Sequence, residues 1–499
     1  MSGFEAARRD KLAELVQRGI APFAYRFERS GTARQAVDGF HEGDETVHRL
    51  AGRLGPARSH GKTVFAHLED HTGRIQVYFK RDQLGPEQFE IVGLFDQDDI
   101  VGVEGPLFKT RTGEITVRVD RVTLLTKALR PLPRGKEDEE GVRHGALTDP
   151  EVRFRQRYAD LAIHPDVRAV FMLRARAVSY IRRFLDARGY LEVETPVLQP
   201  LYGGAAARPF TTRYEALDAT FYLRIADELY LKRCIVGGLE RVYEIGHDFR
   251  NEGLDRWHNP EFTMAEWYEA YADYRDMADG TEALVSGLVT ELAGAAVLER
   301  HGKRVSFERP FARKDFFTLI KETAGVDLTV AGDAELRAAL RSREAESRMA
   351  EQRQFVSADA LSGAKLLDEV FKTLAEPMLV QPTFVLDYPV ALSPLAKRKR
   401  DDPTRVERWE LFVLGREIAN AFSELNDPDE QRRRFEEQAR FRAAGDAEAQ
   451  PLDEDFLRAL EYGMPPTGGV GMGVDRLLMI LADQPSIRDV ILFPMLRPE

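Results

Sequence analysis

The sequence predicts an α+β protein with a small N-terminal β-barrel and a larger C-terminal domain of mixed helices and strands. Three observations support this prediction. The chain has 499 residues, more than a single domain usually holds. Five short strand patterns follow one another in residues 46–126, whereas long helical patterns alternate with strands in residues 151–499. Residues 127–150, which lie between them, are rich in charge and are expected to form a linker.

Residues 1–45 are expected to form an N-terminal extension that begins with a helix over residues 4–18. Leu12, Leu15 and Val16 supply an apolar stripe at helical spacing. Three cations lie beside this stripe and are expected either to face solvent or to contact phosphate. They are Arg8, Arg9 and Lys11.

Residues 46–126 are expected to form a five-stranded barrel of the oligonucleotide-binding type, because five short strands separated by turns suit such a barrel. Barrels of this type bind single-stranded nucleic acid by stacking bases on aromatic rings. Phe65 and Gln76 lie on neighbouring strands and are placed to stack a base and bond its edge, although Phe65 equally fits the barrel core. Arg58 and Glu114 are their candidate neighbours. The predicted strands are residues 47–54, 64–69, 74–79, 99–107 and 114–125.

The linker is predicted to lack regular structure, because it contains Pro131, Pro133 and the charged run 136–140. The charged run is expected to be solvated.

The C-terminal domain opens with a predicted helix over residues 168–188, which ends before Gly189. The apolar side chains of this helix are more numerous than one buried face usually needs. A predicted strand at residues 193–197 follows, shaped by Pro196. A large apolar surface of this kind favours a homodimer interface. Further helices are predicted at residues 275–298, 333–352 and 364–376.

The most informative segment is a predicted hairpin, with strands at residues 241–252 and 261–268 joined by a loop. Side chains alternate along a strand, so Arg250 and Glu252 share one face, and Phe262, Glu266 and Tyr268 share a face on the returning strand. One surface then offers a cation for phosphate, a ring for a base and carboxylates for a cation. This set predicts a site that joins a nucleotide to a ligand with an amino group. The other interpretation is a hairpin with a solvated polar face.

A second hairpin is predicted over residues 409–424, with its turn near residues 414–415. The expected pairing places Phe412 opposite Glu417 and Glu410 opposite Ala419, so that Glu410 and Glu417 share a face. Two carboxylates there would repel unless a cation lay between them, and Mg²⁺ binds one or two carboxylates together with substrate phosphates. The alternative is two exposed acids.

Asn420, Phe422 and Glu424 alternate along the second strand of that hairpin, but their parity is opposite to that of Glu417. A common pocket therefore requires a bulge or bend near residues 419–420.

A glycine-rich run at residues 468–476 precedes an apolar helix and ends with Asp475 and Arg476. Glycines allow the backbone to approach a ligand, and Arg476 at the start of a helix is placed to face phosphate. No βαβ unit follows, so the run is not a dinucleotide fingerprint. Asp475 is expected to be structural.

These segments together resemble the class II aminoacyl-tRNA synthetases, in the form that activates lysine. Residues 189–196, 241–268 and 468–476 resemble the first, second and third signature motifs of that family. Residues 203–210 and 228–232 are also similar to its lysyl form, and the resemblance extends over nearly the whole chain. Two departures are visible: alanines stand at Ala419 and Ala421 in place of the usual glycines, and Trp257 stands where many bacterial relatives have arginine.

The resemblance implies a catalytic domain built on an antiparallel sheet flanked by helices, and a lysine–tRNA ligase activity. The lysine carboxylate would attack the α-phosphorus of ATP to give lysyl-adenylate, and the 3′ end of tRNA(Lys) would then accept the lysyl group. Arg250 would hold the α-phosphate and Arg476 the γ-phosphate. The other implied ATP contacts are Glu252, His258 and Phe262, and the implied Mg²⁺ ligands are Glu410 and Glu417.

The resemblance also implies a lysine pocket. Gly204 and Glu228 would hold the α-amino group, and acids beside Tyr268 would meet the ε-ammonium, which needs paired carboxylates when it is buried. The remaining lysine-binding residues are Glu266, Asn420, Phe422 and Glu424. In the family, the positions of Arg58, Phe65, Gln76 and Glu114 meet the tRNA anticodon.

Two other functions remain open from sequence. A catalytically silent nucleic-acid-binding paralogue would be expected to lose Arg250, Arg476 or Glu417, and all three are present. A lysyl ligase that acts on a translation factor would lack the barrel.

A cytoplasmic protein that does not enter a membrane is expected. Cys234 is the only cysteine, which fits a reducing compartment. No secretory signal is expected, and the sequence has no apolar run of about 18 residues. The net charge of −12 argues against nucleic-acid binding, but the acidic excess lies mainly after residue 150.

Overall fold

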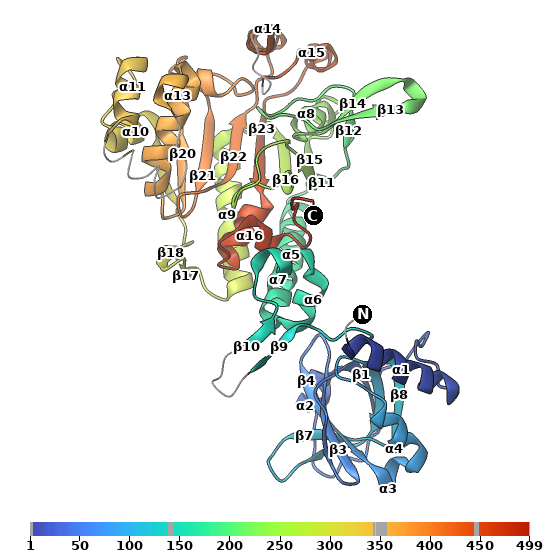
Figure 1. The fold of residues 1–499 in the computed structure, drawn as a ribbon. Helices are drawn as coiled ribbons and strands as arrows, with labels where there is room; N and C mark the ends of the chain where they lie inside the picture. The colour runs from blue at the N-terminus through green and yellow to red at the C-terminus, as the bar shows by residue number, and fades with distance from the viewer. Residues whose placement is uncertain (1–2, 138–142, 343–344, 346–356, 444–448, 499) are drawn as a thin grey trace. The chain divides into compact units, whose positions relative to one another are not determined.

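The computed structural model describes residues 3–137, 143–342, 345, 357–443 and 449–498 (Figure 1). The chain divides into two units, Met1–Asp149 and Pro150–Glu499, and each has its own sheet and apolar core. Within the described part of the chain, no helix is long and apolar enough to cross a membrane.

The N-terminal unit is built on an eight-stranded sheet with the order β6-β7-β4-β3-β1-β5-β8, and β2 pairs with β3 at its side. Its strands are β1 (His48–Leu54), β2 (Arg58–His60), β3 (Thr63–Glu69), β4 (Arg74–Lys80), β5 (Ile100–Gly105), β6 (Leu107–Lys109), β7 (Ile115–Arg118) and β8 (Arg121–Thr126). Its helices are α1 (Gly3–Gln17), α2 (Ala33–Asp38), α3 (Arg81–Leu84) and α4 (Pro86–Gly93).

The eight strands differ from the five that the sequence predicts. The predicted strand at 99–107 is split into β5 and β6 at Pro106, which has no N–H group for the ladder. The predicted strand at 114–125 is split where the backbone changes partner, because Val119 N–H donates to Tyr78 and Asp120 N–H donates to Glu104. Strand β2 was not predicted.

The linker prediction is wrong in part, because β9 (Arg134–Glu137) and β10 (Arg143–Ala146) pair as antiparallel strands. Pro131 and Pro133 precede the pair, so their missing N–H groups cost it no ladder bond. Residues 138–140 of the charged run lie outside the described residues.

The C-terminal unit is built on a second eight-stranded sheet with the order β11-β15-β16-β23-β22-β21-β20-β19. All neighbours are antiparallel except the two outermost pairs, β11 with β15 and β19 with β20. The α+β prediction is therefore confirmed. The strands of this sheet are β11 (Leu191–Glu192), β15 (Arg241–Phe249), β16 (Glu261–Ala270), β19 (Ala312–Asp315), β20 (Thr383–Leu386), β21 (Arg408–Phe412), β22 (Glu417–Ser423) and β23 (Thr467–Gly473).

Smaller elements and helices surround this sheet. The short strands are β12 (Leu198–Gln199), β13 (Thr211–Tyr214), β14 (Ala219–Leu223), β17 (Val297–Arg300) and β18 (Lys303–Ser306). The helices are α5 (Pro150–Arg155), α6 (Arg157–Ile163), α7 (Pro165–Asp186), α8 (Glu228–Val236), α9 (Tyr274–Ala293), α10 (Phe316–Ala324), α11 (Asp333–Leu340), α13 (Gly363–Val370), α14 (Pro428–Ala443), α15 (Glu454–Glu461), α16 (Val474–Leu481) and α17 (Ile487–Val490).

One face of the sheet packs against α7, α9 and α16 and forms the main apolar core of the unit. On β16 this face carries Ala265 and Trp267, and on β23 it carries Val470 and Met472. Alternation therefore turns the intervening residues of both strands to the opposite face. That opposite face carries the candidate site.

Several boundaries differ from the predictions. Helix α7 begins three residues earlier and ends two residues earlier than the predicted helix 168–188, and α13 covers only the first part of the predicted helix 364–376. The strand predicted at residues 193–197 is wrong, because these residues form the connection between β11 and β12.

Helix α9 ends at Ala293 rather than near residue 298, because Gly294 adopts a left-handed conformation with φ of 74° and terminates it. The helix predicted over 333–352 is described as α11 only to Leu340, and most residues from 343 to 352 lie outside the described part of the chain.

Candidate functional site

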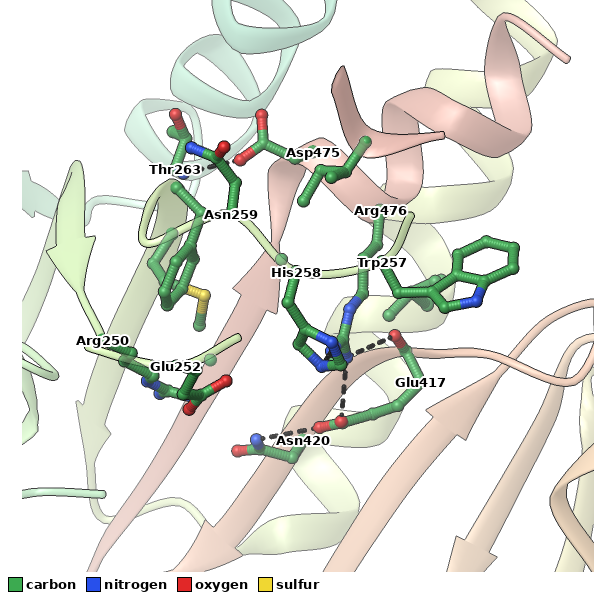
Figure 2. A pocket seen from close by; sticks show the side chains of 17 residues that line it. Arg250, Glu252, Trp257, His258, Asn259, Thr263, Glu417, Asn420, Asp475 and Arg476 are labelled. Carbon is green, nitrogen blue, oxygen red and sulfur yellow. Dashed lines mark hydrogen bonds and ion pairs between the residues drawn. The ribbon is translucent and has the colours of Figure 1, made fainter. Parts of the chain in front are cut away.

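The first hairpin is formed by β15 and β16, but β15 ends at Phe249, so the predicted strand is too long. The Arg250 N–H group still donates to the carbonyl of Pro260 at 2.9 Å, after which the chain enters the loop. Arg250 and Glu252 nevertheless line the same cavity as Phe262 (Figure 2). The guanidinium carbon of Arg250 lies 5.1 Å from the centroid of the Phe262 ring. The hairpin thus brings together a cation and a ring, the pair suited to a phosphate and a base.

The first cavity has a volume of about 110 Å³ and is lined by residues from β16, β22, β23 and the hairpin loop. Arg476, in the first turn of α16, donates to the Glu417 carboxylate at 3.1 Å and to its carbonyl at 3.2 Å. His258 is oriented by Asp255, whose Oδ2 accepts a hydrogen bond from His258 Nδ1 at 2.8 Å. All five predicted ATP contacts line this cavity: Arg250, Glu252, His258, Phe262 and Arg476.

Asp475 belongs to the scaffold, as the sequence predicts. Its carboxylate accepts a hydrogen bond from Thr263 N–H at 2.7 Å and pairs with Arg174 of α7. Figure 2 shows Asp475 and Arg476 directed to different sides of the start of α16. Asp475 therefore ties α16 to the sheet and leaves Arg476 to face the cavity.

The second hairpin contains the predicted bulge, but the predicted register is wrong beyond it. Phe412 pairs with Glu417 as expected, whereas Glu410 pairs with Asn420 rather than Ala419. The ladder shifts by one residue between Leu411 and Phe412, so Ile418 is the extra residue. The bulge brings Asn420 to the same face as Glu417, and Asn420 donates to the Glu417 carboxylate at 3.2 Å.

Glu410 and Glu417 line a second cavity of about 690 Å³ beside the first. Tyr388 donates a hydrogen bond to Glu410 at 2.7 Å, and Arg408 pairs with it. Burial, only partly offset by Arg408, raises the pKa of Glu410. Burial opposes ionisation of Glu417 as well, but Arg476, the hydrogen bond from Asn420 and the nearby arginines together outweigh it, and the pKa of Glu417 lies below its ordinary value.

The donor set of this second cavity fits Mg²⁺ bound mainly through a substrate. Two carboxylates project from paired strands, and the described residues contain no group of three or more acidic, histidine or cysteine side chains with metal-binding spacing. Mg²⁺ keeps several water or phosphate ligands and needs only one or two carboxylates. The site therefore suits an ion that arrives with a nucleotide.

A third cavity of about 240 Å³ opens on the same face of the sheet, and Arg250 lines both it and the first. Gly204 adopts φ of 91° here, a conformation that favours glycine. Gly469 of β23 is equally constrained, because a Cβ atom there would overlap Glu424 and the ring of Tyr268. The seven residues predicted to bind lysine all line this cavity: Gly204, Glu228, Glu266, Tyr268, Asn420, Phe422 and Glu424.

The third cavity is strongly acidic. Burial raises the pKa of Glu424 to about 8, and the opposing ion pair with Lys232 only reduces this shift. Burial, together with Asp227 and Asp248, raises the pKa of Glu266 well above its usual value. Such a site favours a ligand that brings its own positive charge.

Three residues of the site were not singled out from sequence. Lys232 contacts two of the cavity acids, and Arg224 pairs with Glu244 and Asp227 behind the pocket. Arg416 lines the second cavity and lies over the ring of Trp257. No direct sequence signal pointed to Arg416; the only related one was the family resemblance, which implies arginine at the Trp257 position in many bacterial relatives.

The candidate nucleic-acid surface lies on the N-terminal unit. Val64 and Ala66 of β3 face the core, so Phe65 between them faces outward. Its ring contacts Tyr78 of β4 with centroids 4.6 Å apart.

Gln76 and Glu114 lie on the same outer surface. Gln76 donates to Glu114 at 2.7 Å and accepts from Thr116 at 2.8 Å. Arg58 pairs with Phe65 across β2 and β3. The four predicted residues therefore gather on one outward face, and the core interpretation of Phe65 is wrong.

Two known families match the chain. Residues 149–497 match the class II tRNA synthetases (D, K and N), and residues 46–125 match the OB-fold nucleic acid binding domain of the tRNA anticodon type. A lysine–tRNA ligase of Moorella thermoacetica is 51% identical over 497 residues, covering 99% of this chain and 98% of the relative. A lysine–tRNA ligase of Pelotomaculum thermopropionicum is 50% identical over 495 residues, covering 98% of this chain and 94% of the relative. A lysine–tRNA ligase of Carboxydothermus hydrogenoformans is 48% identical over 491 residues, covering 98% of this chain and 97% of the relative.

Proposed function

The chain belongs to the class II tRNA synthetases of the D, K and N group and is a lysine–tRNA ligase, and we propose that the three adjoining cavities are its active site. One observation carries the assignment of these residues. Seven residues from β16, β22, α8 and nearby loops, six with side chains and one glycine, converge on one acidic cavity, which shares Arg250 with the neighbouring nucleotide cavity. Lysine and ATP bound in these cavities would meet at Arg250.

In this proposal, the catalytic work of the chain is positioning and charge stabilisation. Arg250 holds the lysine carboxylate against the α-phosphate, where the carboxylate attacks phosphorus and pyrophosphate leaves. Arg476 holds the γ-phosphate, and Phe262 stacks on adenine beside Glu252 and His258. The 3′ ribose hydroxyl of tRNA then attacks the lysyl carbonyl, and AMP leaves.

Glu410 and Glu417 are the proposed Mg²⁺ ligands. Mg²⁺ bound there would supply positive charge to offset that of the phosphates. Arg476, together with Asn420 and the nearby arginines, holds Glu417 in its ionised form before the nucleotide arrives, which keeps this ligand ready for a cation.

Lysine is distinguished from aspartate and asparagine by the charge of the third cavity. Glu228 and Gly204 hold the α-amino group in the proposal, and Glu424, Glu266 and Tyr268 surround the ε-ammonium. Asn420 and Phe422 complete the wall of this cavity. An aspartate side chain would be repelled by the same acids.

The outward face with Phe65, Gln76, Arg58 and Glu114 is proposed to bind the tRNA anticodon. The protein is further proposed to act in the cytoplasm as a homodimer that pairs through the region of α7 and residues 193–197. The presence of the barrel and of Arg250, Arg476 and Glu417 argues against the translation-factor ligase and the silent paralogue.

ATP–pyrophosphate exchange, measured separately with each of the twenty amino acids, tests this function. We expect exchange with lysine to exceed that with every other amino acid. Preferred exchange with aspartate or asparagine, or no exchange at all, would contradict the assignment.

A further inference from the structure

Lys232 of α8 contacts two acids of the lysine cavity at once. Its Nζ lies 2.5 Å from Glu228 Oε1 and 2.5 Å from Glu424 Oε2, and its side chain has no exposed surface. The two carboxylate oxygens are therefore within about 5 Å of each other. Without a cation between them, two buried carboxylates at that distance would repel.

Lys232 acts from behind the cavity. Glu228 and Glu424 line the cavity, whereas Lys232 does not. Glu228 lies one helical turn before Lys232, but Glu424 follows β22, and its N–H donates to Thr467 of β23 at 2.8 Å. The ammonium thus joins an acid of the helix to an acid of the sheet, across the floor of the pocket.

The number of charges matches the proposed substrate. Three acids line the cavity, Glu228, Glu266 and Glu424. When all three are ionised, as binding of a cationic ligand favours, Lys232 neutralises one of them and two negative charges remain for the two ammonium groups of lysine. The lining cations are engaged elsewhere, because Arg408 pairs with Glu410 and Arg250 also faces the nucleotide cavity.

We propose that Lys232 is a positioning residue for substrate lysine, which neutralises one cavity acid and fixes the spacing of Glu228 and Glu424. This inference rests on the proposed function of the cavity. Burial alone would lower the pKa of Lys232, but the two carboxylates outweigh it and the pKa lies above its ordinary value, so the side chain stays charged. Without this cation, both acids would take up protons more readily and bind an ammonium less well.

The test is a double-mutant cycle on lysine-dependent ATP–pyrophosphate exchange, with Lys232→Met, Glu424→Gln and the double variant. We expect Lys232→Met to raise the KM for lysine at least tenfold and to change the KM for ATP less than twofold. In the Glu424→Gln background, the same substitution should have at least a threefold smaller effect, because the charge that Lys232 neutralises is already absent. Independent effects that multiply in the double variant, or an unchanged KM for lysine in Lys232→Met, would overturn the proposal.

Lys127→Met is the matched control. Lys127 is also fully buried and also bridges two carboxylates, Asp96 at 2.6 Å and Asp99 at 2.8 Å, but within the N-terminal unit. The KM for lysine of the Lys127→Met variant should equal that of the unaltered protein. If Lys232→Met does not fold, Lys232→Gln takes its place in the cycle, with the same expected and contrary results. Failure of the unaltered protein to exchange with lysine would instead overturn the proposed function.

Discussion

Arg416 lies over the indole of Trp257, with its guanidinium carbon 3.7 Å from the ring centroid. Arg416 stands in the turn between β21 and β22, and both residues line the cavity that contains Glu410 and Glu417. The family resemblance implies an arginine at the Trp257 position in many relatives, and Arg416 supplies a cation to this place from the turn between β21 and β22. Contact with an aromatic face restricts the orientation of a guanidinium group but does not neutralise its positive charge.

Arg416→Ala should lower kcat/KM for ATP in the exchange reaction by about 10- to 100-fold, the effect of losing one charge-assisted hydrogen bond to phosphate. The KM for lysine should change little. Arg405→Ala is the control, because Arg405 also lies over a ring, Phe317 at 4.0 Å, but lines none of the three cavities. Equal losses in the two variants would show that Arg416 has no specific role with ATP.

Asp475→Asn should destabilise the C-terminal unit without altering the kinetics of the folded enzyme. The substitution breaks a buried ion pair with Arg174 and weakens the hydrogen bond from Thr263, which costs about 3–5 kcal/mol. Thermal unfolding and exchange kinetics measure the two effects. A large rise in the KM for ATP with unchanged thermal stability would place Asp475 among the ATP contacts instead.

The KM for lysine should fall as pH rises from about 6 to about 8.5. The pKa of Glu424 is raised to about 8, so below that pH its carboxyl group is mostly protonated and pairs poorly with an ammonium. Above it, the carboxylate is formed while the lysine ε-ammonium, with a pKa of about 10.4, remains charged.

Glu424→Gln should remove most of this pH dependence and weaken lysine activation by about 2–4 kcal/mol, with little change in the KM for ATP. A profile that remains as steep in the variant would assign the dependence to another group, such as Glu266.

Phe65→Ala should impair tRNA charging and leave ATP–pyrophosphate exchange intact. The loss of one base–ring stack is worth about 1–3 kcal/mol and should appear in the KM for tRNA. Tyr25→Ala provides a control, since Tyr25 is a fully exposed aromatic residue of the same unit and is not part of the outward face around Phe65. Equal losses of charging and exchange in Phe65→Ala would indicate misfolding rather than lost tRNA contact.

Most residues of the proposed site could be brought together from the sequence, because strand alternation and motif spacing are local properties. The alternation of Glu266 and Tyr268, and the parity conflict between Glu417 and Asn420, were sufficient to predict one pocket face and a bulge. The local sequence does not determine where the bulge lies. Its position depends on which residue of β22 is left without a partner in β21. Glu410 was accordingly assigned the wrong partner.

Lys232 shows what local patterns cannot reveal. A lysine four residues after Glu228 on a helix resembles a common surface ion pair. Only the fold brings Glu424 against it from the sheet and buries all three residues. Arg8 and Lys11 are similar cases, because both were expected to face solvent or phosphate. Arg8 instead donates to the carbonyls of Gln97 and Ala128, and Lys11 pairs with Asp96.

The most direct test of the account is an experimental structure of the protein with L-lysine and a non-hydrolysable ATP analogue. We predict the lysine ε-ammonium within hydrogen-bonding distance of Glu424 and Tyr268, its α-amino group at Glu228, and its carboxylate beside Arg250. Lys232 should remain between Glu228 and Glu424. A lysine bound elsewhere, or with its ε-ammonium away from Glu424, would contradict the central claim that the acidic cavity selects lysine by charge.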